Sequence, residues 1–173
     1  GTDEQQERWI PGLCRGERGA FGLTEASAGS NPSQMVTRAV RDADGWTIDG
    51  SKIFITNGSR GAVTMIFARA IVDGDDHGIT CFLVPQDADG YRGSQIHGKL
   101  GLRAGDTAEI SLEGVRVPGD AVLGEVGGGM KVALSRAVIS LLIAFEAKFD
   151  LIGDVVGLDR TCRYSSHRQA GQR

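Results

Sequence analysis

The pattern of hydrophobic and polar positions changes along the chain. Between Met35 and Val117, apolar residues alternate with polar ones or form short runs, whereas after Gly129 they recur at helical spacing. A period of two favours half-buried strands, and a spacing of three to four favours an amphipathic helix. The sequence therefore predicts a β domain followed by helical structure.

Six strands are predicted in the middle of the chain, and no helical pattern interrupts them. They cover residues 36–41, 46–56, 63–71, 79–85, 91–96 and 107–117. Residues 42–45 are typical of a hairpin turn, and the acidic residues 73–78 of a solvated loop. This arrangement predicts a mainly β domain, an antiparallel sandwich or barrel over residues 20–117, with flanking α-helices and an α+β fold overall.

The two ends of the chain are predicted to be helical. Thr2 with Gln5 three positions later forms a capping-box pattern, and Pro11-Gly12 is expected to end the first helix. Because a helix cap follows the first residue directly, we expect the chain to be a fragment. After a glycine-rich linker the apolar positions form one helical stripe, made of Met130, Leu134, Ala137, Val138, Leu141, Phe145 and Ile152. A second helical piece is expected over residues 157–167, and such a stripe needs partner helices to bury it.

Composition excludes several classes of protein. Hydrophobic residues make up 40% and charged residues 24%, as in a soluble globular protein. The net charge of −3 offers no basic surface for nucleic acid. The longest apolar run, residues 137–145, is too short to span a membrane. The three histidines and three cysteines are scattered, so we expect no metal site, and a reducing compartment fits them. The predicted location is the cytoplasm, or the mitochondrial matrix in a eukaryote.

Four segments carry a resemblance to a known family. FGLTEASAGSN (21–31) resembles the pattern aromatic-x-[LV]-T-E-x-x-x-G-S-D, and SKIFITNGS (51–59) resembles K-x-W-I-T-N-G. KLGLRAGDT (99–107) resembles K-x-G-x-R-x-S-D-T, and residues 113–134 resemble a V-P-x-x-x-x-L-G lead into a helix. These are signatures of the acyl-CoA dehydrogenases, in the family's order. The resemblance implies the middle β domain at residues 20–124. Residues 1–19 would then end an N-terminal helical domain, and residues 125–173 would start a truncated C-terminal one.

The resemblance implies FAD as cofactor, although no G-x-G-x-x-G or P-loop pattern is present. Thr24 and Thr56 would hydrogen-bond the flavin ring, and Phe54 would pack on it in place of the family's usual Trp. Ser30 would lie near the thioester of the acyl-CoA substrate or near the pyrophosphate, and Asn31 replaces the usual Asp. The implied cofactor-binding residues are Phe21, Leu23, Thr24, Gly29, Ser30, Phe54, Ile55, Thr56 and, near the C-terminus, Arg168, which would reach the FAD of a neighbouring subunit.

The implied reaction oxidises an acyl-CoA thioester to the 2,3-enoyl-CoA by α-proton abstraction and hydride transfer to flavin N5. No catalytic residue is assigned. The family's base lies beyond Arg173 or at the position of Ser140, which is no base, so the isolated chain is expected to be inactive. Expected partners are an acyl-CoA, electron-transfer flavoprotein or a similar acceptor, and further copies in a homotetramer. A related flavin oxidase or monooxygenase, and a catalytically inactive truncated β domain, stay open as alternatives.

Simpler structural interpretations stay open for each motif. Phe21, Phe54 and Ile55 are each compatible with core positions of strands. Thr24-Glu25 is compatible with a helix cap, and residues 29–32 with a surface turn. A further set, Lys99, Arg103 and Asp106, is compatible with an ion network that braces a loop.

Overall fold

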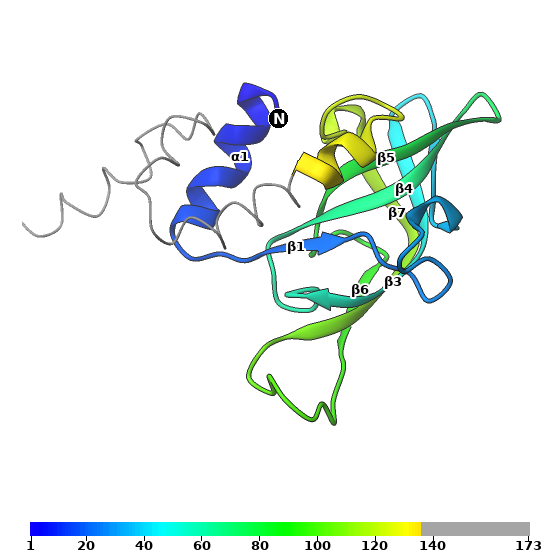
Figure 1. Cartoon of the computed structure of the whole chain (residues 1–173). Helices are drawn as coiled ribbons and strands as arrows, with labels where there is room; N and C mark the ends of the chain where they lie inside the picture. The colour runs from blue at the N-terminus through cyan, green and yellow to red at the C-terminus, as the bar shows by residue number, and fades with distance from the viewer. Residues whose placement is uncertain (136–173) are drawn as a thin grey trace, which may run out of the picture. The chain divides into compact units, whose positions relative to one another are not determined.

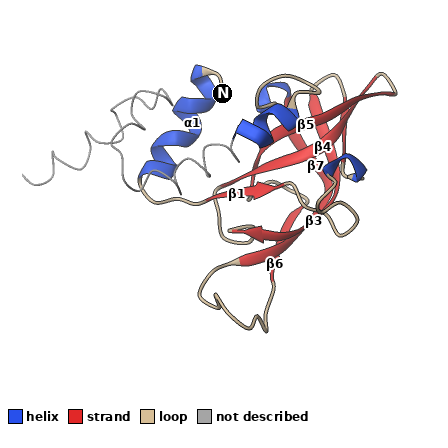
Figure 2. Cartoon of the chain, viewed as in Figure 1, coloured by secondary structure: helices blue, strands red, loops and turns tan. Residues whose placement is uncertain are grey.

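The computed structural model describes residues 1–135 (Figure 1). The chain divides into two compact units, residues 1–132 and 133–173. The first unit holds a helix, α1 (Asp3–Cys14), and a seven-stranded sheet (Figure 2). The strands are β1 (Gly19–Gly22), β2 (Arg38–Arg41), β3 (Gly45–Thr56), β4 (Val63–Val72), β5 (Asp75–Pro85), β6 (Tyr91–Gln95) and β7 (Thr107–Pro118). Two short 3-10 helices, η1 (Pro32–Gln34) and η2 (Gly119–Ala121), lie between and after them, and a further helix begins at residue 129.

The capping box that opens α1 is confirmed, but its predicted end is wrong. The Gln5 N–H donates to Thr2 Oγ1 at 3.3 Å, and the Thr2 N–H donates to Gln5 Oε1 at 3.1 Å. The helix continues through Pro11 to Cys14 and stops before Gly16, whose φ is 104°. Pro11 cannot donate to the Glu7 carbonyl, and because Glu7 is exposed this carbonyl can face water. The left-handed backbone that ends the helix is therefore supplied by Gly16 and not by Gly12.

The mainly β fold is confirmed, and its pairing is more mixed than predicted. The sheet order is β1-β4-β2-β3-β7-β6, with β5 paired to β4. Four of the pairings are antiparallel, but β1 and β2 both run parallel to β4. Turn signals specify antiparallel pairing only between strands joined by a hairpin. They carried no information about β1 or about partners that are distant in sequence.

The β4–β5 hairpin is tighter than the solvated loop predicted for residues 73–78. Val72 pairs with Asp75, which leaves a two-residue turn of Asp73 and Gly74. Both turn residues have positive φ, 53° and 91°, as the tight hairpin turn with matching twist requires. The acidic residues of the predicted loop are exposed as expected, but most of them begin β5.

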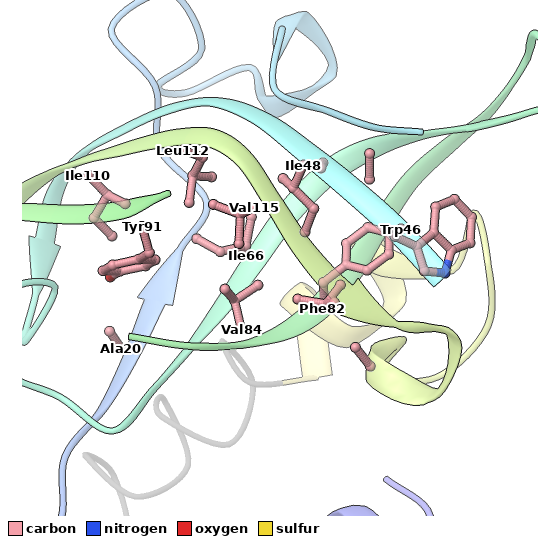
Figure 3. Close-up of a cluster of buried hydrophobic side chains, with 14 of the residues drawn as sticks. Ala20, Trp46, Ile48, Ile66, Phe82, Val84, Tyr91, Ile110, Leu112 and Val115 are labelled. Atoms are coloured by element: carbon pink, nitrogen blue, oxygen red, sulfur yellow. The ribbon is translucent and has the colours of Figure 1, made fainter. Parts of the chain in front are cut away.

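The sheet curls around a hydrophobic core. Residues from strands at opposite ends of the sheet order, Ala20 of β1 and Tyr91 of β6, belong to the same buried cluster. Figure 3 shows this cluster, in which Trp46 packs edge-on against Phe82 with ring centroids 5.2 Å apart. A single sheet that encloses one core corresponds to the barrel alternative of the prediction.

Candidate functional site

A β-bulge in β3 projects an aromatic side chain into solvent. Lys52 pairs with Ile110 and Ile55 with Ala108, so the two residues between them on β3 oppose one residue on β7. One of the two, Phe54, has φ 62° and an exposed fraction of 66%. A bulky residue in the left-handed region is strained, and such strain is concentrated at functional sites. The bulge therefore marks the first candidate position of a site.

The segment that contains β1 runs directly along this bulge. The Ile53 N–H donates to the Thr24 carbonyl at 3.0 Å, and the Asn57 side-chain amide donates to the Gly19 carbonyl at 3.2 Å. These contacts bring the segment 21–25 beside the segment 53–57. The two sequence motifs that were predicted to face a flavin thus meet at one place on the sheet.

A buried ion pair joins the two segments behind this surface. Lys52 Nζ lies 2.7 Å from Glu25 Oε1, and the side chains are 0% and 2% exposed. Glu25 also accepts the backbone N–H groups of Val36, at 2.7 Å, and Thr37, at 3.1 Å. The helix-cap interpretation of Thr24-Glu25 is wrong, because Glu25 forms an isolated β-bridge with Ala28 and points inward. Both residues lie inside the quoted motifs, but the sequence pattern does not indicate that they pair.

Burial and pairing act in opposite directions on the two charged groups. Burial alone would raise the pKa of Glu25, but hydrogen bonds from Lys52, Thr37 and Val36, with the charge of Lys52, hold it below its ordinary value of 4.5. Burial lowers the pKa of Lys52, and Glu25 opposes that shift. Glu25 is therefore a carboxylate at neutral pH.

The predicted flavin-facing residues differ in their accessibility. Phe54 and Thr56 are exposed, while Phe21, Leu23 and Thr24 are half-buried. Within residues 1–135, the hydroxyls of Thr24 and Thr56 make no hydrogen bond. The Ile55 side chain is only 2% exposed and lies in the core cluster, so only its backbone can contact a ligand. For Ile55 the simpler core interpretation is confirmed.

The predicted pyrophosphate side of the site is an exposed turn. Gly29 and Ser30 are exposed, and neither backbone N–H donates a hydrogen bond within the described part of the chain. A methyl group placed on Gly29 would meet no atom within 4 Å, so the space above this turn is open. Asn31 Oδ1 accepts from the N–H and hydroxyl of Ser33, at 3.2 and 2.6 Å, which fixes the end of the turn.

The loop between β6 and β7 is braced by hydrogen bonds and not by the suggested ion network. Lys99 Nζ donates to the Gly105 carbonyl and to Thr107 Oγ1, and Arg103 Nε donates to the Lys99 carbonyl. None of the ion pairs found within residues 1–135 involves Lys99, Arg103 or Asp106. Asp106 instead turns inward toward the end of β3.

Several predicted features lie outside the described residues. These are Arg168, the Ser140 position, the helical stripe beyond residue 135 and the helical piece at 157–167. Within residues 1–135, no group of acidic, histidine or cysteine side chains could hold a metal ion. No helix in this part of the chain is long and apolar enough to cross a membrane.

Comparison with known proteins assigns this domain. The family model described as "Acyl-CoA dehydrogenase, middle domain" matches residues 20–115, which is more than half of the chain. The chain therefore belongs to the acyl-CoA dehydrogenase family, and the described β domain is the family's middle domain.

Individual relatives give the same result. The chain is 33% identical, over 94% of its length, to the mitochondrial short/branched chain specific acyl-CoA dehydrogenase of Rattus norvegicus, of which it covers 36%. It is 43% identical, with a TM-score of 0.70, to a glutaryl-CoA dehydrogenase from Mycobacterium smegmatis solved in complex with FADH2, covering 78% of this chain and 34% of that one. The structure of the prolyl acyl carrier protein oxidase AnaB matches with 33% identity and a TM-score of 0.71, over 77% and 35% of the two chains. The chain thus spans about a third of the length of these relatives.

Proposed function

We propose that the protein containing this chain is an FAD-dependent acyl-CoA dehydrogenase, which oxidises an acyl-CoA thioester to the 2,3-enoyl-CoA. One observation carries the proposal. The strained, exposed Phe54 stands on a bulge beside Thr24 and Thr56, whose hydroxyls have no partner within residues 1–135. Family membership and a relative solved with FADH2 support the same interpretation.

The residues at this surface fit a flavin. An isoalloxazine ring needs an apolar wall and donors at its pyrimidine edge, and Phe54 with the two threonines supplies both kinds of contact. A pyrophosphate needs hydrogen-bond donors in open space, and the backbone N–H groups of Gly29 and Ser30 meet that requirement. When bound, the flavin would accept the β-hydride of the substrate.

The residues of this chain would bind and orient, and they would not abstract the proton. Hydroxyl or backbone donors of Thr24 and Thr56 would stabilise negative charge as it develops on the ring. Ser30 would lie near the thioester of the substrate or near the pyrophosphate of the cofactor. A base must come within about 2.6–3.2 Å of the proton it takes. The only carboxylate of the segments 21–31 and 51–59, Glu25, is buried in its ion pair, so we assign the base to another part of the protein.

The partners of the proposed enzyme follow from the same family. We propose an acyl-CoA as substrate, electron-transfer flavoprotein or a similar acceptor, and assembly as a homotetramer in which Arg168 contacts the FAD of a neighbouring subunit. The proposed location is the cytoplasm, or the mitochondrial matrix in a eukaryote. Acyl-CoA dehydrogenases among the relatives support the substrate class.

The experiment measures bound FAD and its reduction in the complete protein. We expect flavin absorbance on purification and bleaching when an acyl-CoA is added without oxygen. Thr24→Ala and Thr56→Ala should each reduce FAD retention, because each removes a donor to the ring. Asp75→Ala, on an exposed position of β5, is the matched control and should retain FAD like the unmodified protein. A folded protein without flavin, or flavin retention that the threonine variants leave unchanged, would contradict the proposal.

A second candidate is a flavin oxidase that acts on another thioester. The similarity to the prolyl acyl carrier protein oxidase AnaB is the observation that favours it. The same site would then hold the flavin, and the difference would lie in the carrier and in the oxidant. Rapid reoxidation of the reduced flavin by molecular oxygen, with no reduction by any acyl-CoA, would select this candidate.

A further inference from the structure

The turn that follows β3 is fixed by a buried carboxylate from a distant part of the sequence. Asp106 is 8% exposed, and its two oxygens accept from a single residue. Oδ2 accepts the Ser59 N–H at 3.0 Å, and Oδ1 accepts the Ser59 hydroxyl at 2.8 Å. The Asp106 carbonyl also accepts the Asn57 N–H at 3.2 Å. Asp106 thus holds both ends of the segment 57–59.

Two more side chains hold this turn from the core side. The Tyr91 hydroxyl donates to the Gly58 carbonyl at 2.8 Å, and Gln86 Nε2 donates to the Asn57 carbonyl at 2.8 Å. Thr56, directly before the turn, pairs in the sheet with Thr107, directly after Asp106. The Asp106 carboxylate therefore fixes the backbone where the pairing of β3 with β7 ends, next to Thr56.

We propose that Asp106, acting through Ser59, is a positioning residue for the flavin. Asp106 sets the position of the Thr56 side chain and of the bulge that carries the Phe54 ring. This inference rests on the proposed function. Asp106 and Tyr91 are buried, Gln86 is half-buried and all three use their polar atoms, whereas Phe54 and Thr56 are exposed. A ligand site is built in this way, because exposed contact groups keep a productive geometry only when buried neighbours fix them.

The carboxylate is suited to this task because both of its oxygens are used. Hydrogen bonds to an ionised acceptor are shorter and roughly twice as strong as neutral ones. Asp106→Asn keeps one acceptor oxygen for the Ser59 N–H and can donate to the Ser59 hydroxyl, so it weakens the anchor without removing it. Ser59→Ala removes the hydroxyl contact and keeps the backbone one. Both variants should loosen Thr56 while leaving the core residues in place.

The test measures FAD binding by the complete protein and by these two variants. Asp42→Asn is the matched control, because Asp42 Oδ1 also accepts two backbone N–H groups, at 2.9 Å each, but at the opposite end of β3. We expect the dissociation constant for FAD to rise about tenfold in Asp106→Asn and Ser59→Ala, which corresponds to about 1.4 kcal/mol. The visible absorption bands of the bound flavin should shift in both variants and stay unchanged in Asp42→Asn. A general loss of stability that leaves Thr56 in place would not alter the flavin spectrum.

The outcomes separate this inference from the proposed function. If both variants bind FAD as tightly as Asp42→Asn, with the same spectrum, Asp106 is not a positioning residue although the protein still binds flavin. If the folded, unmodified protein binds no FAD, the proposed function fails and the inference fails with it. Asp106→Ala is the stronger perturbation; if it does not fold, Ser59→Ala and Asp106→Asn still decide the question.

Discussion

Replacing Glu25 by Gln should destabilise the fold more than breaking any of the more exposed ion pairs of residues 1–135. The carboxylate is 2% exposed and faces Lys52 Nζ at 2.7 Å, with two backbone N–H groups as further donors. Glutamine keeps one acceptor oxygen but leaves the Lys52 ammonium buried without a counter-charge. Breaking a buried ion pair from one side costs about 3–5 kcal/mol.

The lower end of that range already matters for a domain of this size. A free energy of unfolding is typically about 5–15 kcal/mol, so a loss of about 3 kcal/mol removes a large fraction of it. At about 2–4 °C per kcal/mol for chains of this length, Tm should fall by roughly 6–12 °C. The double variant Glu25→Gln/Lys52→Met removes the stranded charge, so it should regain part of the loss.

Urea unfolding followed by the fluorescence of the buried Trp46 measures the effect. The matched control is Glu113→Gln, because the side chain of Glu113 is exposed and, among the described residues, accepts a hydrogen bond only from the Ser111 hydroxyl, at 3.1 Å. That control should stay within about 0.5 kcal/mol of the unmodified protein. If Glu25→Gln lost less than about 1 kcal/mol, or if the double variant were no more stable than Glu25→Gln, the reasoning about a stranded buried charge would be refuted.

Three further outcomes are expected. Folding lowers the pKa of Glu25 below 4.5, so the Glu25 carboxylate stabilises the fold above pH 4.5, and this stabilisation is lost as the pH falls through the folded pKa. The difference in free energy of unfolding between the unmodified protein and Glu25→Gln should therefore shrink in that acidic range, which an acid titration of stability measures. Gln5→Ala should lower the free energy of unfolding by about 1–2 kcal/mol and speed amide hydrogen exchange in α1, because the Gln5 amide donates to the carbonyls of Asp120, at 2.7 Å, and Val122, at 2.9 Å. Exchange rates like those of the unmodified protein would contradict this. Phe54→Gly should leave the free energy of unfolding unchanged or raise it by up to about 1 kcal/mol, because a φ of 62° suits glycine, and it should weaken FAD binding. A large loss of stability in calorimetry would show instead that the Phe54 ring packs in the fold.

Local patterns predicted most of the fold, because strands and hairpins are local features. The period of two located β3, β4 and β7 within a residue or two of their ends, and the capping box located the start of α1. The parallel pairings of β4 could not be predicted in this way, because they join segments that no hairpin connects. The length of α1 was misjudged for a related reason: an exposed proline is tolerated where its lost hydrogen bond can be replaced by water.

The candidate site was predictable as a set of motifs but not as a geometry. The motifs contained Thr24, Phe54 and Thr56, but strict alternation from the buried Lys52 would bury Phe54 and expose Ile55, and the register shift in β3 reverses the two. In a regular strand adjacent residues alternate between faces, and a bulge breaks that rule at a position the sequence does not mark. The partners of Glu25 and Asp106 were missed because each contacts a side chain far away in the chain.

The strained backbone of Phe54 lies between two segments that buried polar contacts anchor, and this has a physical cause. A bulky residue held at positive φ costs about 1–3 kcal/mol, and it persists only where the surroundings determine it. On one side of Phe54, the Glu25–Lys52 pair fixes the strand before the bulge. On the other side, the bonds of Asp106 to Ser59 fix the turn that follows it. Since the ring of Phe54 is 66% exposed, burial of the ring cannot offset the strain. The two anchors must do so, and the proposed flavin site would need them to hold this aromatic ring in place.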